Sequence, residues 1–246
     1  MKLSLKNVLI EKYGLDEKTA IGTIMSGSVS VNGQKEIRVN SPVDIDKCKI
    51  EFIGMIKREV SRGALKLERA FDRFNICLNS GICLDVGSST GGFTSTLLKN
   101  GAKRVYAVDC GTNQLDYSLR IDSRVVVMEN QKAQLLTAED IPEDIDLCTA
   151  DLSFTSSVSI IEYLKKKLAI QRFVVLIKPQ FEYSRLVDLL QLSKNFNGIV
   201  KNDDDRVRIV DFIKNEFIIK GFNIKDIVVS PIKGSKGNEE YLFYLQ

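Results

Sequence analysis

The stretch ICLDVGSSTGGF, residues 82–93, indicates how this chain folds. Its first five residues, which include Asp85, are typical of a strand in a parallel sheet. Gly87, Gly91 and Gly92 follow in a turn where the backbone can approach a ligand closely, and the helix behind the turn offers free N–H groups. The spacing G-x-x-x-G-G is neither a P-loop, which requires Gly-Lys-Ser/Thr, nor the dinucleotide motif G-x-G-x-x-G. Taken alone, it fits a plain strand-to-helix turn as well as a binding site.

A second acidic strand end favours the binding site. Asp109 in RVYAVDCG, residues 104–111, comes 22 residues after Gly87. Nucleotide-binding α/β folds use a carboxylate at this place to accept the ribose hydroxyls. An acidic strand end can also be a solvated cap, but the two features together favour a ligand that contains a nucleoside.

Strand and helix patterns alternate over the rest of this region, which predicts a doubly wound, mostly parallel α/β sheet. Helices are expected at 92–100, 113–120, 155–168 and 205–220. The expected strands are Ile82–Val86, Val105–Asp109, Val125–Met128, Ile145–Ala150, Phe173–Ile177, Ile224–Val229 and Tyr241–Leu245. Only SPIKGSKGNEE separates the last two strands, so we expect them to pair antiparallel.

Residues 1–54 have the pattern of a separate small module, with two short amphipathic helices and an Asn32-Gly33 hairpin turn. A linker is expected over 55–62, and the larger domain over 63–246. The segment 55–75 carries six basic and three acidic side chains. Such a segment suits phosphate contacts, although a solvated linker helix explains each arginine equally well.

Composition narrows the possible functions. The 246 residues are 44% apolar and 27% charged, as in ordinary globular proteins, and the net charge of +3 does not by itself imply nucleic acid. The absence of histidine excludes histidine triads and histidine-bound metals. The five cysteines lack CxxC spacing, so no structural metal or disulfide framework is expected. Without a signal-like segment or a membrane-length apolar run, we expect a cytoplasmic protein with no membrane contact.

Two further strand ends carry charges. Asp151 ends the strand in DIDLCTADLSF, and Lys178 ends the apolar strand in RFVVLIKPQFE. The carboxyl ends of parallel strands line one crevice, so both side chains are expected to face the same ligand. The alternative is a surface lysine, which the apolar lead-in to Lys178 and the presence of Asp151 make less attractive.

Several motifs together resemble the TlyA family: VSRGALKLERAF, LDVGSSTGGFT, RVYAVDCG, ADLSF, LIKPQFE and SPIKGSKGNEEYLFYL. These proteins carry a hemolysin label and are FtsJ-like, S-adenosylmethionine-dependent ribosomal RNA 2′-O-methyltransferases. The resemblance implies a Rossmann-like class I methyltransferase with a seven-stranded sheet, acting on the ribose of a cytidine in ribosomal RNA of a ribosomal subunit. It implies that residues 1–54 form an RNA-binding domain of the S-four type. We expect a monomer.

The resemblance also implies roles for individual residues. It places a catalytic tetrad on Lys66, Asp151, Lys178 and Glu240, with Glu239 as the reserve for the last position. S-adenosylmethionine is expected against Asp85, Gly87, Ser88, Ser89, Gly91, Gly92, Phe93, Asp109 and Asp151. RNA is expected against Lys57, Arg58, Arg62 and Arg69.

The chain departs from the family pattern at ENQKAQ, residues 129–134, and in a long loop expected over 183–202. The first departure bears on adenosine contacts, and the second on substrate contacts. In the mechanism that we hypothesise, neutral Lys178 takes the ribose hydroxyl proton while the other tetrad members orient it and balance charge. The alternatives are a membrane-active hemolysin, a non-catalytic RNA-binding or ribosome-assembly protein, and a methyltransferase acting on a small molecule or protein.

Overall fold

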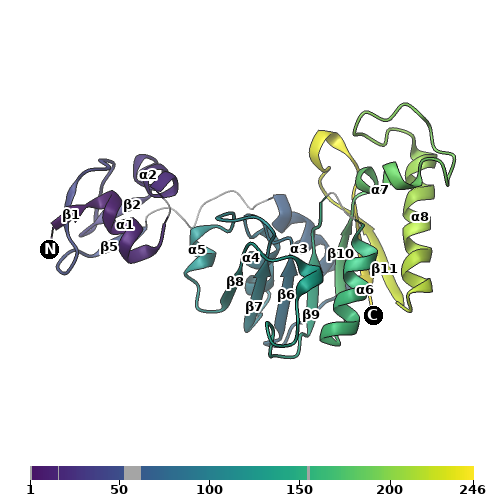
Figure 1. Ribbon diagram of the computed structural model, residues 1–246, viewed down its shortest axis with the longest axis horizontal. Helices are drawn as coiled ribbons and strands as arrows, with labels where there is room; N and C mark the ends of the chain where they lie inside the picture. Colours follow the sequence, from purple (N-terminus) through teal and green to yellow (C-terminus); the bar gives the residue numbers. More distant parts are fainter. Residues whose placement is uncertain (1, 16, 53–61, 154–155) are drawn as a thin grey trace. The chain divides into compact units, whose positions relative to one another are not determined.

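The computed structural model describes residues 2–15, 17–52, 62–153 and 156–246 (Figure 1). The chain divides into two compact units, Met1–Val60 and Ser61–Gln246. Most of the predicted linker, 55–61, lies outside the described residues. Within the described residues, no helix has the length and apolar character that a membrane span requires.

The small unit contains the two predicted helices and the predicted hairpin. Ser4 begins the first helix by accepting the N–H of Asn7 at 3.2 Å, and Gly14 ends it at φ +67°. The Asn32-Gly33 turn, with both φ angles positive, joins two strands of a three-stranded sheet ordered β3-β2-β5. A separate pair, β1 with β4, is antiparallel. The elements are β1 (Lys2–Ser4), α1 (Leu5–Tyr13), α2 (Glu17–Met25), β2 (Val29–Val31), β3 (Gln34–Lys35), β4 (Pro42–Asp44) and β5 (Ile50–Phe52).

The large unit is built on a seven-stranded sheet, counted over the described residues, with the order β11-β12-β10-β9-β6-β7-β8. The strands are β6 (Ile82–Val86), β7 (Arg104–Val108), β8 (Val125–Met128), β9 (Leu147–Ala150), β10 (Phe173–Ile177), β11 (Ile224–Val229) and β12 (Tyr241–Leu245). β6 to β10 run parallel, and β12 runs antiparallel between β10 and β11. The predicted α/β fold and the antiparallel pairing of the last two strands are therefore confirmed.

Helices cover both faces of this sheet, which explains the unbroken apolar run in β10. Val174 and Leu176 pack on one face, against α3 (Arg62–Phe74) and α4 (Gly92–Lys99). Phe173, Val175 and Ile177 point to the other face, where α6 (Ser157–Leu168) and α8 (Asp203–Ile219) cover them (Figure 1). Because successive side chains of a strand alternate between faces, a strand covered on both sides has no polar position.

The expectation for the segment after Lys178 was partly wrong. The segment after Lys178 begins with a helix, α7 (Pro179–Leu186), so the loop expected over 183–202 starts inside a helix. Pro179 stops the strand because it has no N–H group to donate. It suits the first position of a helix, because the N–H group at that position makes no hydrogen bond within the helix. Asn202 then begins α8 by accepting the N–H groups of Asp204 and Asp205.

Candidate active site

The glycine-rich turn after β6 is shaped by its protein neighbours. Gly87 and Gly91 have φ angles of +78° and +93°. A Cβ on Gly87 would lie 2.5 Å from the carbonyl oxygen of Asp151, and one on Gly91 would lie 2.1 Å from Cδ1 of Leu119 in α5 (Tyr117–Arg120). These two glycines therefore let the turn pack against β9 and α5, a requirement that the sequence pattern did not distinguish from close approach to a ligand.

Asp85 supports the turn from below. Its carboxylate is fully buried and accepts hydrogen bonds from Oγ1 of Thr94 at 2.6 Å and Oγ1 of Thr149 at 2.9 Å. Burial raises the pKa of Asp85 to about 6, although the two hydroxyl groups favour its ionised form. It does not line either of the cavities described next, so its side chain ties α4 and β9 to β6 beneath the turn.

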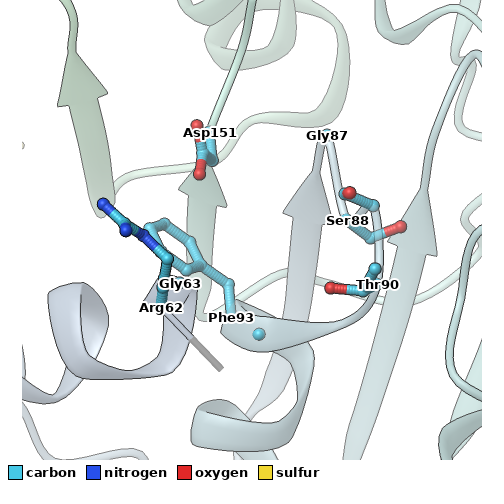
Figure 2. A pocket seen from close by; sticks show the side chains of 9 residues that line it. Arg62, Gly63, Gly87, Ser88, Thr90, Phe93 and Asp151 are labelled. Atoms are coloured by element: carbon cyan, nitrogen blue, oxygen red, sulfur yellow. The ribbon is translucent and has the colours of Figure 1, made fainter. Parts of the chain in front are cut away.

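Two cavities of about 480 and 300 Å³ open on either side of the turn and share Gly87, Ser89 and Asp151. The larger is walled by Asp109, Cys110, Leu152, Ile160 and residues 131–134, among others. The smaller is walled by Arg62, Gly63, Ser88, Thr90, Gly92 and Phe93 (Figure 2). Oγ of Ser88 is buried without a hydrogen-bond partner among the described residues. The nine residues predicted to bind a cofactor thus gather around one strand-end region, with Asp85 beneath the surface and Gly91 buried against α5.

Asp109 lies at the end of β7, on the wall of the larger cavity. Oδ2 accepts the N–H of Ser89 at 2.8 Å, and Oδ1 accepts the N–H of Gly111 at 2.7 Å. The carboxylate is therefore fixed between the glycine-rich turn and the following loop, with lone pairs remaining on both oxygens for hydroxyl donors.

Glu129 is a supporting residue that the motif reasoning missed. It accepts the N–H groups of Asn113, Gln114 and Leu115 at 2.8–3.1 Å and Nη2 of Arg120 at 2.7 Å. Burial opposes its charge, but these donors outweigh that effect and lower the pKa of Glu129 to about 2. The helix expected over 113–120 forms only as α5, from Tyr117, because Asn113 has a φ of +53° and Asp116 caps the helix by accepting the N–H of Ser118. The residues that follow, 131–134, line the larger cavity, so the departure from the family pattern falls on its wall.

The four predicted tetrad residues form two ion pairs. Nζ of Lys178 lies 2.5 Å from Oδ1 of Asp151, and it also donates to Oγ of Ser153 at 3.1 Å. Nζ of Lys66 lies 2.6 Å from Oε2 of Glu240, with both side chains buried. Strand register explains the proximity of the two pairs at one sheet edge, because Ile177 of β10 pairs with Tyr241 of β12. Lys178 and Glu240 are the adjoining residues of these two antiparallel strands.

Glu239, the reserve for the last tetrad position, contacts residues outside the tetrad. Oε1 of Glu239 accepts a hydrogen bond from the hydroxyl group of Tyr241 at 2.7 Å and lies 3.1 Å from Nε of Arg206. Glu239 is therefore engaged in a network of its own, while Glu240 faces Lys66.

The residues predicted to contact RNA are only partly described. Lys57 and Arg58 lie outside the described residues. Arg62 is exposed at the start of α3, lines the smaller cavity and donates to the carbonyl of Lys233. Arg69 is exposed farther along the same helix.

A parallel strand edge with a glycine-rich turn and a carboxylate at the next strand end is typical of α/β proteins that bind a nucleoside-containing ligand at that edge. The family model described as FtsJ-like methyltransferase matches residues 59–246. The chain belongs to the FtsJ-like methyltransferase family.

Known relatives match most of the chain. Hemolysin A of Brachyspira hyodysenteriae is 42% identical, with 94% of each chain covered. The 16S/23S rRNA (cytidine-2′-O)-methyltransferase TlyA of Mycobacterium tuberculosis is 36% identical over 91% of this chain and 81% of that protein. The solved structure of a putative hemolysin from Streptococcus thermophilus matches 99% of this chain and 88% of its own, at 33% identity and a TM-score of 0.69. The predicted resemblance to the TlyA family is thereby confirmed.

Proposed function

We propose that this protein transfers a methyl group from S-adenosylmethionine to the 2′-hydroxyl of a cytidine in ribosomal RNA. The observation that carries the proposal is the pair of ion pairs at one sheet edge, Lys178 with Asp151 and Lys66 with Glu240. Asp151 belongs at once to this cluster and to the walls of both cavities, so an acceptor held at the cluster adjoins a cofactor held in the cavities. The similarity to the Mycobacterium tuberculosis 16S/23S rRNA (cytidine-2′-O)-methyltransferase supports this substrate.

The lining residues fit the cofactor. Asp109 would receive the ribose hydroxyls, Leu152 and Ile160 offer apolar surface for the adenine, and Ser88, Ser89 and Gly92 border the amino-acid end. The buried, unpartnered Oγ of Ser88 supports a polar ligand group in the smaller cavity. When bound, the cofactor supplies an electrophilic methyl group on a sulfonium.

In the mechanism we propose, the Lys178 ammonium first gives up a proton to solvent, and its neutral Nζ then receives the proton of the ribose hydroxyl as the oxygen attacks. The resulting ammonium is stabilised by Oδ1 of Asp151 at 2.5 Å and by Oγ of Ser153 at 3.1 Å. Lys66 and Glu240 neutralise one another at 2.6 Å, so they add local order to the edge without a net charge. Holding the hydroxyl beside the base supplies proximity as well as proton transfer.

Contacts to the RNA are assigned to the small unit, as an S-four-type domain over residues 1–54, and to basic residues near its junction with the larger one. Arg62 and Arg69 are exposed and available to phosphates, and Lys57 and Arg58 belong to the same basic segment. We infer a cytoplasmic monomer that acts on ribosomal subunits.

The test is methyl transfer from labelled S-adenosylmethionine onto separated ribosomal subunits that lack the modification. Lys178→Ala should lower the rate by about 10²–10⁴-fold, the usual contribution of a general base, while cofactor affinity stays unchanged. Lys214→Ala, which removes an exposed lysine of α8, is the matched control and should retain full activity. Substantial transfer by Lys178→Ala would refute the role of that lysine. Absence of label in both subunits with the unaltered chain would refute the proposed function.

A further inference from the structure

The carboxylate of Glu240 is enclosed by groups from three separate segments. Lys66 of α3 holds Oε2 at 2.6 Å, and Nε2 of Gln180 in α7 donates to Oε1 at 3.1 Å. On a third side, a Cβ added to Gly234 would lie 2.0 Å from Oε1. The Lys66 ammonium thus contacts one carboxylate oxygen of Glu240, and the Gln180 amide contacts the other. Gly234 has no Cβ, and Oε1 of Glu240 occupies the space that a Cβ would fill.

The side chain of Gln180 does not favour folding stability, because one of its polar atoms is buried without a partner among the described residues. Its side chain is buried, with 7% of the residue exposed, and Oε1 has no hydrogen-bond partner among the described residues. A buried acceptor without a donor costs about 1–3 kcal/mol. An apolar side chain of similar size would avoid that cost, so the amide has a use that its N–H group must supply.

The orientation of the amide is tied to the charge on Glu240. The amide of Gln180 is oriented so that its N–H group, at Nε2, points to Oε1 of Glu240 and donates a hydrogen bond to it. Turning the amide over would bring two oxygens together without a proton between them, unless the carboxyl group were protonated. Gln180 therefore donates to the same carboxylate that pairs with Lys66.

Gln180 is also rigidly linked to Lys178. Lys178 is the residue that precedes α7, Pro179 opens the helix, and Gln180 follows in the first turn. Proline fixes its own φ and restricts the residue before it, so the end of β10 and the start of α7 are stiff. The sequence Lys-Pro-Gln thus places a lysine toward Asp151 and an amide toward Glu240 at a fixed separation.

We propose that Gln180 is a positioning residue of the active site, whose N–H fixes the Glu240 carboxylate against Lys66. This inference rests on the proposed function. The cations on the residues that adjoin Glu240 are engaged elsewhere: Lys178 pairs with Asp151, and Arg206 pairs with Glu239. Lys66 already holds the other carboxylate oxygen.

Two isosteric substitutions test the role. Gln180→Met keeps the volume and removes the donor, so kcat should fall at least about tenfold at every pH, while KM for ribosomal RNA and the affinity for S-adenosylmethionine stay unchanged. At alkaline pH, Gln180→Glu should have a kcat as low as that of Gln180→Met. As the pH falls, the kcat of Gln180→Glu relative to that of the unaltered chain should rise. Protonation gives the introduced carboxyl group an O–H that can donate to Glu240. Gln171→Met and Gln171→Glu, at an exposed position, are the matched controls.

A role in packing alone predicts the opposite result. Gln180→Met would then retain kcat within about twofold, and Gln180→Glu would show no recovery at low pH; either outcome overturns the inference. If either substitution lowers the thermal unfolding temperature strongly, Gln180→Asn, which is smaller and keeps an amide too short to reach, should still lose kcat. Full activity of that variant would also overturn the inference. Failure of the unaltered chain to transfer methyl groups overturns the proposed function itself.

Discussion

The buried carboxylate of Asp85 makes the stability of the large unit depend on pH. Burial raises the pKa of Asp85 from 3.8 to about 6 in the folded protein. The folded state therefore binds this proton more tightly than the unfolded state does, so the free energy of unfolding decreases as the pH rises from below 3.8 to above 6. Two pKa units correspond to about 3 kcal/mol, and about half of that loss should fall between roughly pH 5 and pH 7.5.

Asp85→Asn removes this titration while keeping the shape of the side chain. The change should flatten the pH dependence, so that the difference in unfolding free energy between variant and unaltered chain shifts by about 1–2 kcal/mol in favour of the variant from pH 5 to pH 7.5. Any constant loss from rearranged threonine hydroxyls cancels in this comparison. Urea unfolding followed by far-ultraviolet circular dichroism at a series of pH values gives the two curves.

The control is Asp211→Asn, which changes an exposed carboxylate on α8 and should run parallel to the unaltered chain. If the Asp85→Asn curve is parallel as well, Asp85 is not stabilised in its protonated form by burial, and the account of the support beneath the turn is wrong.

Three further predictions concern the walls of the site. Gly87→Ala should cost about 1–3 kcal/mol from its positive φ and should also displace the strand end beside it, so activity falls too. Gly101 also has a positive φ, but an added Cβ would meet open space there. Gly101→Ala should therefore lower stability and leave activity unchanged; equal activities of the two variants would contradict the packing argument. Glu129→Gln should weaken S-adenosylmethionine binding about tenfold by calorimetry, because several donors lose a charged acceptor; unchanged affinity would count against its support of the cavity. Arg69→Gln should lower the salt dependence of RNA binding, a log–log slope, by about 0.7–0.9, and Lys167→Gln should leave it unchanged; identical slopes would exclude a phosphate contact at Arg69.

The sequence predicted the five parallel strands of the large unit well because each of them is largely apolar and is followed by a charged residue or a glycine. Asp109, Asp151 and Lys178 were expected at one sheet edge on this ground alone, and the structure brings their strand ends there. Strand ends in a parallel sheet share an edge whatever the details of packing, so this inference needs only the order of elements.

Pairings across the sheet were beyond such reasoning. The contacts of Glu240 with Lys66 and Gln180 join residues 174 and 60 positions apart, and they depend on β12 lying beside β10. Side-chain spacing along one segment carries no information on that register. Likewise, the helix after Pro179 was missed because proline stops a strand and opens a helix with equal ease, and the support by Glu129 was missed because a lone glutamate has no pattern.

The position of β12 has a consequence for synthesis of the protein. β10 lies in the middle of the sheet, yet one of its two edges is covered only by residues Tyr241–Leu245. A growing chain that has reached β11 leaves the backbone of its most apolar strand open on that side, where it can pair with the wrong partner. Glu240 directly precedes β12, so methyl transfer should appear only after β12 is inserted between β10 and β11, which are made before it. The same strand therefore completes both the sheet beside β10 and the proposed active site.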